Sequence, residues 1–394
     1  MKSTLREIIT ILTLLLVATT VSAQQSDGGK EYFMPVITSV PSLSITPDAR
    51  AGGMGDVGAA TYPDINAQHW NPAKYAFNDS RAGVSLSYTP WLRKLVNDIN
   101  LVYLAGFYKL GNSDLQALSA SLRYFSLGEV AITDDNGTPI NSIHPYEMAV
   151  DLGYSRKLSE NFSGAVALRY ILSDFRTDSE GAVGNAFAAD VAGYYQKYLF
   201  VGRNECLLSL GFNISNIGTK ISYDHGNTSF FIPTNMRLGG SFSFPMDDYN
   251  FLSLSLDLNR LLVPSRPVNT TGDPDDPDYL KKLDDYYNMS SITGIFKSFG
   301  DTPDGFSGEL KKINLSIGAE YDYNHQFFAR LGYHYEHPMM GNRQFFTFGA
   351  GFKLNIFSLD AAYLVSTAQS NPLDQTLRFS LSFDLDGIKS ILER

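Results

Sequence analysis

The sequence predicts an all-β fold, a 14-stranded antiparallel transmembrane β-barrel, from three observations. Apolar and polar residues alternate over segments of about 10–12 residues, the connections between these segments differ systematically in length, and charged residues fall on the polar side of the alternation. Beyond the N-terminus, no stretch approaches the ~18 consecutive apolar residues of a membrane-spanning helix, which excludes a helical membrane bundle.

Residues 1–23 are predicted to be a secretory signal peptide. Lys2 and Arg6 precede an apolar run over residues 8–18, and a small-residue cleavage site follows, ending at Ala23. A helix of this length is too short to cross a ~30 Å hydrocarbon core, which argues against the alternative of an N-terminal anchor helix. We therefore expect an exported protein that is cleaved after Ala23.

The overall composition excludes some functions. The formal net charge is −10, whereas a nucleic-acid-binding protein needs a basic face. Cys206 is the single cysteine, so neither an intrachain disulfide nor a zinc site built from cysteines can form.

The N-terminal segment, residues 24–81, lacks long alternation and carries a glycine-rich run. A phosphate-binding loop is an alternative interpretation, but no Lys-Ser or Lys-Thr pair ends the run. We favour glycines that let the backbone pack closely against a barrel wall, followed by a turn at Asn71-Pro72. The residues that we expect to shape this segment are Gly52, Gly53, Gly55, Asp56, Trp70, Asn71 and Pro72.

The barrel is predicted over residues 82–385. In one segment Leu252, Leu254, Leu256 and Leu258 alternate with polar residues, which gives a strand one apolar and one polar face. Soluble strands usually run about 5–6 residues, whereas a tilted membrane-spanning strand needs about 9–11. The fourteen predicted strands are 82–91, 98–109, 114–126, 145–156, 162–174, 185–197, 205–216, 234–244, 250–261, 312–324, 326–336, 343–354, 356–366 and 376–385.

The connections support the same architecture. Those after the second, fourth, eighth, tenth and twelfth strands are short, whereas those after the third, fifth, seventh and ninth run from about ten to about fifty residues. Short periplasmic turns that alternate with long outer loops are typical of outer-membrane barrels. This pattern places the N-terminus and a tail at residues 386–394 on the periplasmic side. A large soluble β-sandwich or propeller would explain the alternation but not the long strands with sided loops.

Charged residues in the predicted strands fall on the polar faces of the alternation. A charge that faced lipid at mid-depth would cost about 2–4 kcal/mol for Arg or Lys, so we expect these side chains to line the lumen. The charged residues on the polar faces are Arg123, Glu147, Asp151, Arg169, Asp190, Arg237, Asp257, Glu320, Asp322, Arg330, Lys353, Asp360, Arg378 and Asp384.

The longest connection, residues 262–312, is predicted to be a functional outer loop. One part, residues 273–278, is acidic, but it lacks the spacing and the turn glycine of an EF-hand, so a solvated loop is the favoured interpretation. Another part is apolar and aromatic, as expected of a partner-contact surface; the alternative is a loop that folds back over the barrel mouth. The predicted contact residues are Tyr286, Tyr287, Ile295, Phe296 and Phe299.

No catalytic or metal site is predicted. His325, His334 and His337 are near one another in sequence, but no carboxylate completes a convincing ligand set. No nucleophile elbow or comparable signature occurs. We therefore expect a protein that is not an enzyme and that needs no cofactor.

The stretch ARAGGMGDVGAATYPDINAQHWNPAKYAF, residues 49–77, resembles the hatch segment of FadL-like outer-membrane proteins, and within them the PorV (LptO) family of the type IX secretion system. The resemblance implies a barrel in the cell outer membrane whose N-terminal segment is a hatch folded into or under the lumen. It also implies a shuttle that takes the C-terminal signal domain of an exported protein from the type IX translocon to the attachment complex containing the PorU sortase. The expected surroundings are the lipid bilayer and lipopolysaccharide.

A FadL-like transporter of hydrophobic small molecules is the alternative function. The predicted inward wall is small and charged, with few large apolar residues, which suits a plugged interior better than a greasy pocket. The sequence therefore favours the shuttle.

Overall fold

The computed structural model describes residues 35–93, 96, 98–111, 114–134, 136, 138–176, 181–269, 272–302, 304–367 and 373–385. The predicted signal peptide and the predicted tail at residues 386–394 lie outside the described residues. The chain divides into two compact units, Met1–Phe33 and Met34–Arg394, and all the strands belong to the second.

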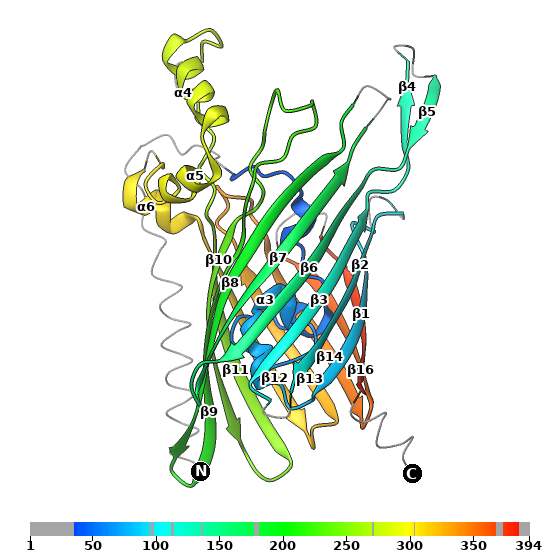
Figure 1. Cartoon of the computed structure of the whole chain (residues 1–394), viewed down its shortest axis with the longest axis vertical. Helices are drawn as coiled ribbons and strands as arrows, with labels where there is room; N and C mark the ends of the chain where they lie inside the picture. The colour runs from blue at the N-terminus through cyan, green and yellow to red at the C-terminus, as the bar shows by residue number, and fades with distance from the viewer. Residues whose placement is uncertain are drawn as a thin grey trace. The chain divides into compact units, whose positions relative to one another are not determined.

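Fourteen strands form one closed antiparallel barrel, as predicted, in which β1 pairs with β16 to complete the ring (Figure 1). Closure leaves no unpaired strand edge, which a membrane-spanning sheet requires. The barrel strands are β1 (Ala82–Pro90), β2 (Asn100–Leu110), β3 (Gln116–Ser126), β6 (Tyr146–Lys157), β7 (Phe162–Asp174), β8 (Gly184–Val201), β9 (Asn204–Gly218), β10 (Asn235–Pro245), β11 (Asn250–Leu261), β12 (Ile313–Tyr323), β13 (Phe327–Tyr335), β14 (Gln344–Leu354), β15 (Phe357–Ser366) and β16 (Leu377–Asp384).

The connections are sided, as predicted. At one end, here the short-turn end, they span two to five residues, and at the other, the long-loop end, they are longer. The turn between β8 and β9 is only residues 202–203, because both strands continue beyond their predicted ends at residues 197 and 205. A bulge between Ala189 and Val191 interrupts the pairing of β8 with β9.

Two of the long connections contain structure that was predicted as loop. A hairpin of β4 (Val130–Thr133) and β5 (Pro139–Ile143) lies between β3 and β6. The connection between β11 and β12 holds three helices, α4 (Pro277–Asn288), α5 (Ser291–Lys297) and α6 (Gly305–Lys311), here the helical lobe. The Asp276 carboxylate accepts hydrogen bonds from the backbone N–H groups of Asp278 and Tyr279, and Pro277 occupies the first turn, so α4 begins with a standard cap.

The two faces of the wall differ as the alternation predicts. Leu168 on β7 is 69% exposed, whereas the next residue, Arg169, is buried inside the barrel. Of the fourteen charged residues predicted on the polar faces, eleven are buried, and the other three, Asp322, Lys353 and Asp384, line a cavity at the short-turn end of the lumen. Among the described residues, no helix is long and apolar enough to cross a membrane.

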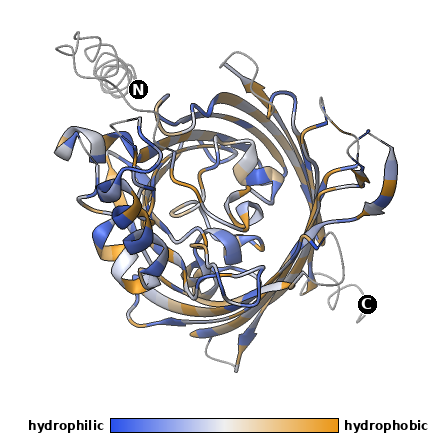
Figure 2. Cartoon of the chain, turned by 90° about the horizontal axis from the view of Figure 1, so that it is seen from above, coloured by the Kyte–Doolittle hydropathy of each residue, from blue (hydrophilic) through white to orange (hydrophobic). Residues whose placement is uncertain are grey.

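The N-terminal segment, described from residue 35, lies inside the ring of strands when the barrel is viewed along its axis (Figure 2). Its regular elements are short: η1 (Pro41–Ser44), α2 (Ala49–Gly52), α3 (Ala67–Trp70) and η2 (Pro72–Phe77). Its first described residues do not lie at the short-turn end, where the N-terminus was predicted. Ser39 N–H donates to the Phe231 carbonyl, 2.9 Å away, in the long connection between β9 and β10. The segment therefore runs through the lumen from the long-loop end to the start of β1.

We predict that Leu168→Arg lowers the free energy of unfolding in lipid vesicles by about 2–4 kcal/mol, because it places a charge at the middle of the lipid-facing wall. Urea unfolding followed by tryptophan fluorescence measures the change. The matched control is Leu158→Arg, in the short turn after β6, where the side chain is 64% exposed and the cost should fall to about 0–1 kcal/mol. Equal costs at both positions would contradict the assignment of the lipid-facing wall.

Candidate functional site

Two regions carry the predicted functional residues: the N-terminal segment in the lumen and the helical lobe at the long-loop end. The segment is tied to the wall by buried charges and close backbone contacts. The lobe presents exposed apolar side chains.

The glycine-rich run lies against strands β12 to β16. A Cβ atom at Gly52 would lie 2.7 Å from Arg378 Cδ, and one at Gly53 would lie 2.8 Å from Gly349 Cα. Gly55 has a φ of +71°, and its N–H donates to Thr347 Oγ1, 2.7 Å away. These contacts explain the glycines, because side chains would hold the segment away from the wall.

Asp56 follows the glycines in the left-handed backbone region, with a φ of 64°. Its Oδ1 lies 4.0 Å from a guanidinium nitrogen of Arg378, which is buried in the wall. Asp56 thus lies beside the Arg378 cation of the wall, next to the backbone contacts that the glycines make.

Trp70 is a central buried side chain of the segment. Its Nε1–H donates to the Asp48 carboxylate, 2.6 Å away, and the Arg237 guanidinium carbon lies 4.5 Å from its ring centre. Asp48 also caps α2 by accepting from Ala51 N–H, 2.9 Å away. One carboxylate therefore links the two short helices α2 and α3.

Asn71 and Pro72 lie where the chain passes from α3 to η2. Asn71 Nδ2 donates to the carbonyls of Ala59 and of Gly193 on β8, and its Oδ1 accepts from Ala73 N–H at the start of η2. Pro72 occupies the first turn of η2, where its missing N–H costs nothing. The Asn-Pro pair thus joins the segment to the wall as well as turning it.

The wall charges hold the segment, a role that the sequence alone could not assign. Asp257 accepts from the N–H groups of Gly58 and Ala59 at 2.8 and 2.9 Å, and Glu147 accepts from Ser42 N–H at 3.0 Å. These bonds satisfy backbone donors that would otherwise be buried without partners.

Arg50 carries the segment's ion pairs with the wall. Its guanidinium contacts the Glu320 carboxylate at 2.9 Å, and Asp64 within the segment at 2.8 Å. Glu320 in turn pairs with Arg330, which also contacts Asp360; both distances are 2.6 Å. The result is an alternating chain of buried and half-buried charges in which each charge has a partner of opposite sign, as a charge withdrawn from bulk water requires.

Burial also changes the ionisation of the segment. It raises the pKa of Asp48 to about 6, and the Asp64 carboxylate adds to this shift. It lowers the pKa of His69 well below its ordinary value, and the neighbouring Arg123 cation acts in the same direction. Neutral His69 is a suitable acceptor for Arg123, whose guanidinium lies 2.9 Å from His69 Nδ1.

A cavity of about 570 Å³ remains at the short-turn end of the lumen. Seven carboxylate residues and three basic residues line it, together with aromatic side chains that include Tyr62 and Phe251. His325 stacks on Phe251 and contacts Asp322. His334 on β13 forms a hydrogen bond with Ser316 on the neighbouring strand β12. Within the described part of the chain, no group of three or more His, Cys, Asp or Glu residues is arranged to hold a metal ion.

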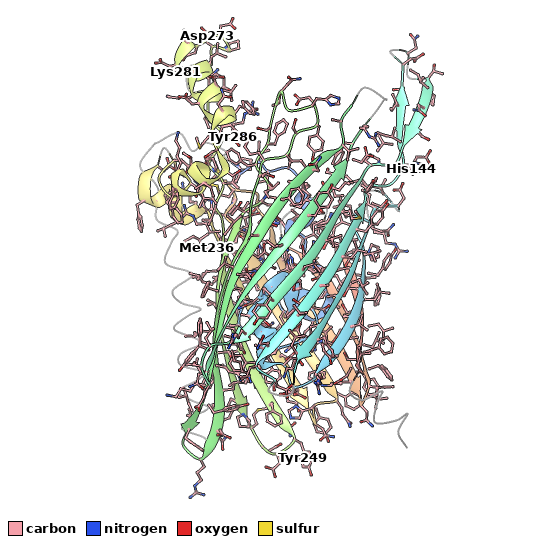
Figure 3. All side chains as sticks on the ribbon, viewed as in Figure 1. His144, Met236, Tyr249, Asp273, Lys281 and Tyr286 are labelled. Carbon is pink, nitrogen blue, oxygen red and sulfur yellow. The ribbon has the colours of Figure 1, made fainter. Side chains whose placement is uncertain are left out.

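The predicted contact residues of the helical lobe are not equally accessible. Tyr286 is buried against Phe231 and Val263 and forms the base of the lobe, while Tyr287 and Ile295 are half-buried. Phe296 is 74% exposed, and Phe299 is also exposed. Figure 3 shows Tyr286 at the lower end of α4, with Lys281 and Asp273 higher, toward the tip of the lobe. The accessible apolar surface among the predicted residues is therefore on and just after α5.

One family model matches this chain. The family is described as type IX secretion system protein PorV, and the match covers residues 30–268, more than half of the 394 residues. No curated protein sequence matches the chain.

Several solved barrels resemble the fold. The toluene transporter TodX of Pseudomonas putida has 10% identity and a TM-score of 0.48, with 90% of this chain and 99% of that chain covered. The toluene transporter TbuX of Ralstonia pickettii has 12% identity and a TM-score of 0.46, with coverages of 87% and 99%. A FadL homologue of Pseudomonas aeruginosa has 11% identity and a TM-score of 0.42, with coverages of 89% and 99%. Likenesses at this level support no inference about what this chain binds.

We predict that Gly332→Ala destabilises the folded protein by about 1–3 kcal/mol. A Cβ atom there would lie 2.0 Å from backbone atoms of Met54 and Gly55, so the N-terminal segment would have to move. The control is Gly240→Ala, where the nearest atom, Leu210 Cδ2, is at an ordinary 3.6 Å. Urea unfolding should separate the two variants, and a neutral Gly332→Ala would contradict the tight seating of the segment.

We also predict that deleting residues 24–81 raises the conductance of the reconstituted protein several-fold, because the described part of this segment occupies space that water would fill. Planar-bilayer recordings measure the change, and a heat-dependent shift in gel migration verifies that the variant still forms a barrel. Removing residues 131–142 of the β4–β5 hairpin is the control and should leave conductance unchanged. Equal conductance with and without the segment would show that it does not seal the lumen.

Proposed function

This chain belongs to the family of the type IX secretion system protein PorV, and on that premise we propose that it is a cargo shuttle of the outer membrane. Membership makes it a component of the type IX secretion system. In the proposed role it binds the C-terminal signal domain of exported proteins at the translocon and delivers them to the attachment complex that contains the PorU sortase. The signal peptide would direct export and be removed after Ala23.

The observation that carries the proposal is the division of the molecule into a filled lumen and an exposed apolar lobe. A lumen occupied by a segment with buried ion pairs leaves little room for a substrate to pass. The lobe instead offers Phe296 and Phe299 at the long-loop end, which is the outer face in barrels of this kind. Exposed aromatic side chains are typical anchors of protein interfaces.

Transport of hydrophobic small molecules is the second candidate, because a cavity of about 570 Å³ opens at the short-turn end. Its charges make this role the weaker one. Seven carboxylate residues, among them Asp79, Glu205 and Asp384, share the lining with aromatic and aliphatic side chains, and an apolar ligand would have to desolvate them. The shuttle therefore remains the better-supported function.

We predict that replacing Phe296 and Phe299 with serine leaves the barrel folded but lowers recovery of exported proteins or translocon about tenfold, since each is exposed in the free chain and would be buried at an interface. The measurement is a pull-down with tagged full-length protein, quantified by mass spectrometry. Tyr249→Ser, an exposed aromatic position at the short-turn end, is the matched control and should leave recovery unchanged. Unchanged recovery with the double variant would count against a contact role for α5.

A further inference from the structure

An arginine on the outside of the barrel reveals where part of the helical lobe lies. Arg237 points into the lumen, because its guanidinium lies over the ring of Trp70. Met236, the preceding residue on β10, therefore points outward, and the strand register pairs it with Arg260 on β11. Paired residues share a face of the sheet, so Arg260 projects from the lipid-facing wall near the long-loop end.

The lobe covers this outward arginine. Arg260 Nη2 donates to the Ser298 carbonyl, 2.8 Å away, and also bonds the Glu309 carboxylate on α6. The Phe299 ring centre lies 4.7 Å from its guanidinium carbon. Arg260 is consequently buried, although it projects from the outside of the barrel.

A second cation strengthens the attachment. Lys312, immediately before β12, is buried and contacts Asp301, and its Nζ lies 3.7 Å from Glu309 Oε1. The two cations and two carboxylates thus neutralise one another. This four-residue cluster fixes α6 to the exterior of the wall, beside β11 and β12, in agreement with its lateral position in Figure 1.

Helix α6 turns apolar side chains away from this cluster. Phe306 is 79% exposed and Leu310 is 52% exposed, and their four-residue spacing places them on one face of the helix. Gly308 and Glu309 lie on the buried side. The lipid-facing side chains of the adjacent strands, which include Leu258 and Ile317, are likewise exposed in the isolated chain.

We propose that α6 is an interfacial membrane element, with Phe306 and Leu310 inserted among the acyl chains of the outer leaflet. The occupant is lipid because the apolar face continues the lipid-facing wall and the charges beneath it are already paired. Aromatic and aliphatic side chains with this placement are typical of helices that lie at a membrane surface. The inference requires only that the barrel be in a membrane and does not depend on cargo binding.

Tryptophan quenching tests the proposal. Full-length Phe306→Trp protein is reconstituted into vesicles of phosphatidylcholine with and without bromine on the acyl chains. Leu280→Trp on α4 is the matched control, because Leu280 is also exposed but α4 projects furthest from the barrel (Figure 1). The wild-type signal, from Trp70 and Trp91, is subtracted from both.

The brominated lipid should reduce the Phe306→Trp emission by at least about twofold and leave Leu280→Trp nearly unchanged, while aqueous iodide should do the opposite. Quenching of the Phe306→Trp variant by iodide alone would overturn the proposal, and so would protection from both quenchers, which would place the introduced indole against protein. Leu310→Trp provides a second reporter if Phe306→Trp fails to give a heat-modifiable barrel. Cargo recovery is measured separately with the Phe296 and Phe299 variants, so failure of this inference leaves the proposed function intact.

Discussion

The structure depends on how ionised side chains are buried inside a closed barrel. Apart from Arg260, which the helical lobe covers, the middle of the lipid-facing wall excludes them, so the alternation of the strands sends them inward, toward the N-terminal segment. An isolated charge in that position would be strongly destabilising. Here Arg169 contacts both Asp151 and Asp190, and Arg330 joins Glu320 to Asp360. Removing one partner would leave the other charge unpaired, so the members of each cluster stabilise the barrel only together.

The same constraint explains how the described part of the N-terminal segment is held in place although it has little regular structure. Its short helices leave many backbone donors and acceptors without internal partners. Side chains of the wall supply them: Asp257 and Glu147 accept from backbone N–H groups, and Arg123 donates to the Ile45 carbonyl. Wall and segment thus provide hydrogen-bond partners for each other's backbone and side chains.

The sequence predicts the barrel better than it predicts the contacts of the N-terminal segment in the lumen or the helices of the lobe. Period-two alternation is a property of each strand, so strand number, sidedness and the inward direction of the charges could all be read from it. The partners of those charges depend on the register between neighbouring strands and on the position of the N-terminal segment, which the alternation within one strand does not encode. Two of the three lobe helices, α5 and α6, were missed because they have only seven residues each, too few to be stable alone. The capping residues Asp276 and Ser290 were the available signal.

The lumen and the lobe are physically continuous. Val36, near the first described residue, packs with Phe231, Val263 and Tyr286, which form the base of the lobe. From there the segment runs past Asp48, which bonds Trp70, to Tyr62. The Tyr62 hydroxyl donates to Asp79 beside the cavity at the short-turn end. Displacing the segment to open a pore would therefore remove part of the support beneath the lobe. A protein whose outer surface must keep its shape has a physical reason to keep its lumen filled, and this coupling favours a binding role over a channel.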